Sequence, residues 1–94
     1  MFLRTVLTMI ETDNPEKSYI YDIKIFSEND KFVTLGGCDE FVNMEHVLTR
    51  NEVKPFNERI FEDQETALKW YKAYLKILRK RKNLKIVKEQ VFSE

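Results

Sequence analysis

The segment spanning residues 63–83 constrains the fold most, because its apolar residues recur at the spacing of an α-helix. On a helical wheel its cations gather on one stripe, and its apolar side chains fill an arc of about 200°. That arc is wider than the roughly 100° stripe with which a helix faces one sheet. Asp63 is a suitable N-cap, and Glu62 and Glu65 lie at the positive end of the helix dipole. The helix is expected to end near Asn83.

Several shorter segments have the composition of β-strands and are separated by turn residues. The clearest is "SYIYDIKIF" (18–26), in which apolar and polar residues partly alternate; the turn "SENDK" and a third strand, "KFVTLGG", follow it. Gly36-Gly37 is expected to end or bend that strand. The expected strands cover residues 5–14, 18–26, 31–37 and 56–61. A short helix over 2–10 is an alternative for the first.

Two segments stay ambiguous. Residues 38–55 fit a short helix or an irregular excursion, and residues 84–91 fit a short strand or a packed tail. The expected fold is α+β, with one domain over residues 1–94: a small antiparallel sheet of three to four strands with one long C-terminal helix packed on it. At 43% apolar residues the chain is well outside the disordered range. The residues expected to make the helix–sheet contact are Leu68, Tyr71, Leu75 and Leu78 on the helix and Ile23, Ile25 and Val33 on the sheet.

The formal net charge of zero conceals a division along the chain. Residues 1–66 hold 7 Lys/Arg and 14 Asp/Glu, a net −7, whereas residues 67–94 hold 9 and 2, a net +7. This asymmetry predicts one acidic and one basic face, or mutual neutralisation within the fold. A single cysteine and the lack of a secretory signal favour a cytoplasmic protein that does not enter a membrane.

The basic stripe of the helix is the first candidate site. Its members are Lys69, Lys72, Lys76, Arg79 and Lys80. Such a stripe suits the phosphates of a nucleic acid, because each neutralised phosphate releases counterions. It equally suits an acidic protein surface, and a solvated lysine face that binds nothing is the plain alternative.

The apolar flank of the same helix is the second candidate site. Trp70, Ala73 and Ile77 extend the apolar arc beyond what one sheet covers. This flank predicts a homodimer or a contact with another protein, since Trp and Tyr dominate interface energetics. Alternatively, the sheet, the excursion and the tail form a cradle that buries it within the chain.

Reactive chemistry is sparse. His46 lies close in sequence to Cys38 and Asp39, but no paired spacing of a metal site accompanies them. Gly36-Gly37 lacks the lysine and hydroxyl residue of a phosphate-binding loop. The sequence therefore predicts a protein with no catalytic residues, no metal and no cofactor.

The order of elements resembles the WGR domain, a family named for a Trp-Gly-Arg triplet. The matching segments are "KSYIYDIKIF", "KFVTLGG" and the close of the domain, in which Phe61 and Glu62-Asp63 precede "ETALKWYKAYLKILRKRK". The family occurs in DNA-damage-responsive ADP-ribosyl transferases and in small bacterial proteins. The triplet falls at Leu35-Gly36-Gly37, so its glycine is present while the Trp and Arg, which carry much of the family's DNA contact, are replaced. The resemblance implies an α+β fold and association with DNA.

Three function classes follow from these observations. The first is a non-catalytic binding module whose basic helix face contacts nucleic acid. The second is a protein-binding adaptor or inhibitor, such as a phage or mobile-element product that acts on a host complex. The third is an enzyme, against which the thin inventory of reactive residues argues.

Overall fold

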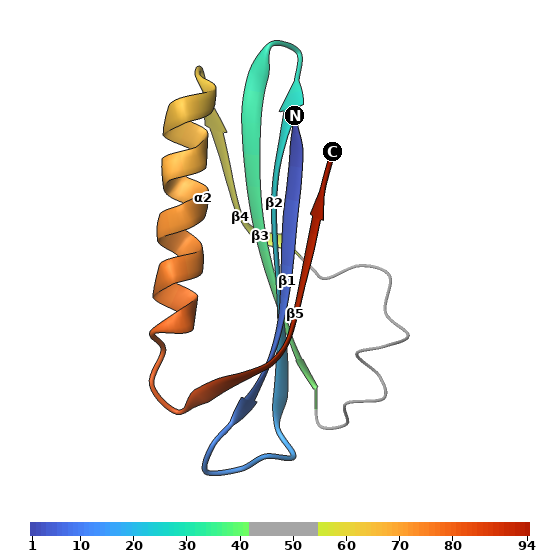
Figure 1. Cartoon of the computed structure of the whole chain (residues 1–94), viewed down its shortest axis with the longest axis vertical. Helices are drawn as coiled ribbons and strands as arrows, with labels where there is room; N and C mark the ends of the chain where they lie inside the picture. Colours follow the sequence, from blue (N-terminus) through green and yellow to red (C-terminus); the bar gives the residue numbers. More distant parts are fainter. Residues whose placement is uncertain (42–54) are drawn as a thin grey trace.

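The computed structural model describes residues 1–41 and 55–94, with the side chains of 38–41 and 55–57 left undescribed. Five strands and one helix make up this part of the chain. They are β1 (Phe2–Glu11), β2 (Ser18–Glu28), β3 (Lys31–Phe41), β4 (Pro55–Phe61), α2 (Gln64–Arg79) and β5 (Leu84–Ser93). The strands form one antiparallel sheet in the order β4-β3-β2-β1-β5, and α2 runs along one face of it (Figure 1).

The predicted α+β class and the packing of one long helix on the sheet are confirmed, but the predicted number of three to four strands is wrong. The fifth strand is β5, which resolves the ambiguity of residues 84–91 in favour of a strand. It pairs with β1 from the opposite end of the chain, at the edge of the sheet away from β4. The first segment is a strand rather than a short helix, and it begins earlier than expected, at Phe2.

A tight hairpin sets the register of the sheet centre. Asn29 and Asp30 both have positive φ, 52° and 62°, and Glu28 pairs with Lys31 across them. Two successive left-handed residues are the geometry of the type I′ turn, whose twist matches that of paired strands. The turn places Thr34 beside Ile25 on the face toward α2 and Val33 beside Phe26 on the other face. The expectation that Val33 lies under the helix is therefore wrong.

β3 continues past Gly36-Gly37 to Phe41, so the prediction that these glycines end the strand is wrong. The β3–β4 register does shift between the two glycines, an irregularity of the kind that glycine accommodates. The predicted short helix or excursion over residues 38–55 is replaced at its ends by β3 and β4. Its remainder, residues 42–54, lies outside the described residues.

α2 begins where the sequence predicts and ends earlier. The Asp63 carboxylate accepts a hydrogen bond from the Thr66 backbone N–H at 2.8 Å, which is the N-cap contact. Lys80 caps the other end, and Asn83, with φ of 65°, turns the chain into β5. The prediction that the helix ends near Asn83 is therefore about one turn too long.

The core lies between α2 and the sheet. Ile23 and Ile25 are fully buried, and the helix contributes Tyr71, Leu75 and Leu78 as expected, while Leu68 is only partly buried. Among the described residues, the buried cluster between α2 and the sheet comprises Leu7, Met9, Tyr21, Ile23, Ile25, Ala67, Tyr71, Leu75 and Leu78. A hydrogen bond between the Thr5 and Tyr71 hydroxyls joins β1 to α2 within this layer.

Candidate functional site

The predicted basic stripe lies on the surface of α2 that faces solvent. The helix turns Ala67, Tyr71, Leu75 and Leu78 toward the sheet, and the cations occupy a separate arc of the wheel. All five stripe residues are exposed: Lys69, Lys72, Lys76, Arg79 and Lys80. We call this surface the lysine face.

Two of the five cations are paired with carboxylates. Lys69 forms an i,i+4 ion pair with Glu65, at 3.3 Å between Nζ and Oε1. Arg79 donates to the carboxylate of Glu89 on β5, which ties the end of the helix to the edge strand. Both are surface contacts that contribute little to stability, but each reduces the local positive charge. The sequence could not predict the second pair, because it depends on where β5 lies.

The other three cations remain without such a partner. Among the described side chains, those of residues 1–37 and 58–94, no carboxylate lies within ion-pair distance of Lys72, Lys76 or Lys80. They recur every four residues, so the rise of 1.5 Å per residue spaces them about 6 Å apart along the helix axis. The uncompensated charge of the lysine face is therefore a row of three ammonium groups.

Arg81, in the turn between α2 and β5, contacts an aromatic residue of the sheet. The Arg81 guanidinium donates to the Tyr21 hydroxyl at 3.1 Å and lies 5.6 Å from the centre of that ring. Arg81 thus covers the end of the core instead of extending the row.

The predicted apolar flank is divided between an internal stack and an exposed remainder. Trp70 is partly buried and stacks on Tyr74, with ring centroids 5.1 Å apart and planes 10° from parallel. The Tyr74 ring in turn lies over Gly36 of β3, where an added Cβ would be 3.6 Å away. Ala73 and Ile77 are exposed, Ile77 at 59%. Trp70 is thus packed within the chain, whereas Ala73 and Ile77 face solvent, and the contact of this flank with another chain stays a prediction.

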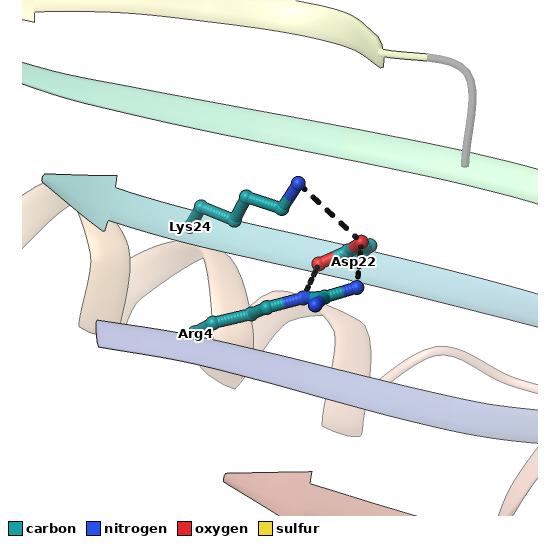
Figure 2. Close-up of polar contacts among 3 residues, drawn as sticks. All are labelled: Arg4, Asp22 and Lys24. Atoms are coloured by element: carbon teal, nitrogen blue, oxygen red, sulfur yellow. Dashed lines mark hydrogen bonds and ion pairs between the residues drawn. The ribbon is translucent and has the colours of Figure 1, made fainter. Parts of the chain in front are cut away.

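A polar cluster that sequence reasoning missed lies on the sheet face away from α2. Arg4 of β1 donates two hydrogen bonds to the Asp22 carboxylate of β2, at 2.9 and 2.8 Å, and Lys24 approaches it at 3.9 Å (Figure 2). The Asp22 side chain is only 4% exposed. The hydrogen bond to Asp22 raises the pKa of Arg4 above its ordinary value. Arg4 also lies over the ring of Phe92, 5.5 Å from its centre.

The chemistry of this cluster is that of a cross-strand brace. Arg4 and Asp22 sit diagonally on paired strands, where opposite charges support one register. Both oxygens of the Asp22 carboxylate accept from the Arg4 guanidinium, and the side chain is buried, so little of the carboxylate is open to a substrate. The signal in the sequence was a lone aspartate within an apolar strand, which calls for a buried partner.

The candidate reactive residues of the sequence lie outside the part of the chain whose side chains are described. The side chains of Cys38 and Asp39 belong to the undescribed set, and His46 lies outside the described residues. Among the side chains of residues 1–37 and 58–94, no group of three His, Cys, Asp or Glu is placed to hold a metal ion. No helix in the same ranges combines the length and apolarity needed to cross a bilayer.

Comparisons with known proteins leave the lysine face and the fold as the basis for any functional argument. No protein-family model, no curated protein and no solved structure matches this chain.

Proposed function

We propose that this chain is a small non-catalytic binding module that contacts nucleic-acid phosphates through the lysine face of α2. The observation that carries the proposal is the exposed row of Lys72, Lys76 and Lys80, which has no carboxylate partner within the described residues. A lysine row without internal compensation suits a polyanion, since binding releases the counterions condensed on the phosphates.

The chemistry of lysine predicts what kind of binding this is. Ammonium groups act as point charges and discriminate poorly between bases, so the contact positions the protein without reading sequence. Three neutralised phosphates give a log–log salt slope of roughly −2.7, at about −0.9 for each duplex phosphate. The affinity of such non-specific binding is about 10⁻⁴ to 10⁻⁶ M at physiological salt.

The acidic remainder of the chain limits the footprint. Glu62 and Glu65 are exposed at the start of α2, next to the first turn of the lysine face. Their charge repels phosphates there, so binding is expected to centre on the second half of the helix.

A pair of charge-matched variants tests the proposal. Duplex and single-stranded DNA are titrated at low salt against the parent, Lys72→Glu/Lys76→Glu and the control Lys82→Glu/Lys85→Glu. The control makes the same change in net charge at exposed positions outside α2. Loss of binding in the helix variant alone supports the lysine face. Absence of binding by the parent, or equal loss in the control, overturns the proposal.

The protein-binding alternative, an adaptor or inhibitor, is favoured by one specific feature. Ile77 is 59% exposed and follows Lys76 directly, so an apolar side chain borders the lysine row. An acidic partner surface with an apolar depression would engage both groups. Affinity capture from native lysate, with and without nuclease, distinguishes the two functions. Partners that survive nuclease and are lost with Ile77→Glu favour the adaptor.

A further inference from the structure

Among the described strands, the last one, β5, forms an open edge of the sheet. β5 pairs with β1 on one side and ends the strand order on the other. Every residue from 87 to 94 is exposed, including three large apolar side chains: Val87 at 44%, Val91 at 60% and Phe92 at 44%. Edge strands with exposed apolar residues are templates for pairing with another strand.

The backbone groups that point away from the sheet can be identified. The Glu94 N–H donates to the Phe2 carbonyl of β1 at 3.4 Å. Along an antiparallel strand, the residues that bond to one neighbour alternate with those that do not. The even-numbered residues of 88–94 therefore bond to β1. Glu89, Val91 and Ser93 direct their N–H and C=O groups to the free edge.

The two halves of β5 differ in how they are protected. Thr8 pairs with Lys88 and Met9 pairs with Ile86, so Val87 is an extra residue that interrupts the ladder. A bulge and lysines are common devices that prevent edge-to-edge pairing, and they occupy the first half of β5. The second half, residues 89–93, has neither. Its one charged side chain, Glu89, is already paired with Arg79.

We propose that this second half of β5 pairs antiparallel with the same strand of a second copy of the chain, about a two-fold axis at Val91. In this register the two Val91 side chains face each other, and Gln90 lies opposite Phe92 of the second copy. Lys88 lies opposite Glu94, twice by symmetry, so opposite charges meet on both sides of the axis.

Neighbouring registers are chemically worse. Moving the axis to Gln90 places the Glu89 carboxylate opposite Val91, and moving it to Glu89 places two carboxylates face to face. Moving it outward to Phe92 shortens the paired segment. The side-chain pattern of residues 88–94 thus selects the axis at Val91.

The position of the helix permits this assembly. α2 makes most of its contacts with β2, β3 and β4, away from the free edge of β5, and it reaches β5 at the Arg79–Glu89 ion pair. A two-fold axis perpendicular to the sheet keeps each face continuous, so both helices lie on the same face and neither blocks the joined edges. The contact is a strand pair with few side chains, so association is expected to be weak and dependent on concentration.

Sedimentation velocity of the intact chain over a range of concentrations tests the pairing. The parent is expected to shift from monomer to dimer, and Val91→Lys, which places two ammonium groups at the axis, to weaken association about tenfold or more. Lys88→Glu alone is expected to weaken it about tenfold, and Lys88→Glu/Glu94→Lys to restore it to within about threefold. Ile77→Glu tests the other predicted interface, on the α2 flank, and is expected to leave this self-association unchanged.

Amide hydrogen exchange supplies a second readout that does not depend on a mutation. The amides of Glu89, Val91 and Ser93 are expected to gain protection with protein concentration, while those of Gln90 and Phe92 are already bonded to β1 and do not change. A monomer at every concentration overturns the inference. So does dissociation by Ile77→Glu with Val91→Lys unaffected, or failure of the charge exchange to restore association. None of these outcomes bears on DNA binding by Lys72 and Lys76.

Discussion

The hydrogen bond between Thr5 and Tyr71 offers a sharp test of how α2 is held on the sheet. Both residues are 3% exposed, and their hydroxyls meet across the helix–sheet layer. Tyr71→Phe keeps the ring and removes only the hydroxyl, which leaves the Thr5 hydroxyl buried without its partner. The expected loss in free energy of unfolding is about 1–3 kcal/mol, the desolvation penalty of an unpaired buried group. For a domain of this size that is a fall in Tm of about 4–8 °C per kcal/mol.

The assay is urea denaturation at neutral pH, with Thr5→Val and the double variant completing a mutant cycle. Removing both hydroxyls leaves no unpaired group, so the double variant is expected to be less destabilised than the two single variants together. Equal stability of Tyr71→Phe and the parent would contradict this hydrogen bond. So would single-variant losses in free energy of unfolding that add up to the loss in the double variant.

The buried Tyr71 phenol also makes the stability of the parent depend on pH in the alkaline range. Burial raises the pKa of Tyr71 above its ordinary value of 10.0, because the fold disfavours the phenolate. The stabilisation from the neutral phenol is therefore complete below pH 10.0 and is lost as pH rises through the raised value. Tyr71→Phe has no such group, so the stability gap between parent and variant is expected to narrow in that range.

Three further predictions concern the core, the polar cluster and the helix cap. Leu75→Ala is expected to cost about 2–5 kcal/mol, and a thermal melt identical to that of the parent would contradict the packing of α2. Asp22→Asn removes the carboxylate from the Arg4 fork and is expected to cost about 1.5–3 kcal/mol in chemical denaturation, whereas an unchanged midpoint would show that the brace contributes nothing. Hydrogen bonds from Thr66 hold the pKa of Asp63 below its ordinary 3.8, so this group stabilises the fold above pH 3.8 and its contribution is lost as pH falls through the lowered value. The stability of Asp63→Asn should not show this loss on acidification. Identical acid-denaturation profiles of the parent and the variant would contradict the assignment of the cap.

Local patterns were sufficient where the structure depends on neighbours in sequence. The N-cap at Asp63, the strand at residues 18–26 and the outward face of α2 all follow from spacing over a few residues. The face of β3 could also have been predicted. A two-residue turn at Asn29 and Asp30 determines which residues of β3 point to each face of the sheet. In this register Val33 points away from α2.

The remaining differences come from contacts between distant segments. The pairing of β5 with β1 joins residues that no short window contains together, so 84–91 read equally well as a strand or a tail. β3 runs through its glycines because strands pair on both sides of it, a gain that outweighs the weak local preference. For the candidate site, periodicity alone identified the five cations. Only the position of β5 shows that Arg79 is bound to Glu89, which reduces the free row to three lysines.

The pairing of the first strand with the last has a consequence for how the chain folds. β1, β2 and β3 follow one another as antiparallel neighbours, so their contacts can form while the chain is still being made. β5 reaches β1 only after the helix has been synthesised, and until then the backbone groups on the outer side of β1 have no strand partner. Unpaired strand edges make incompletely folded chains prone to aggregation. Between the synthesis of β1 and the docking of β5, the outer edge of β1 is therefore open to pairing with another chain.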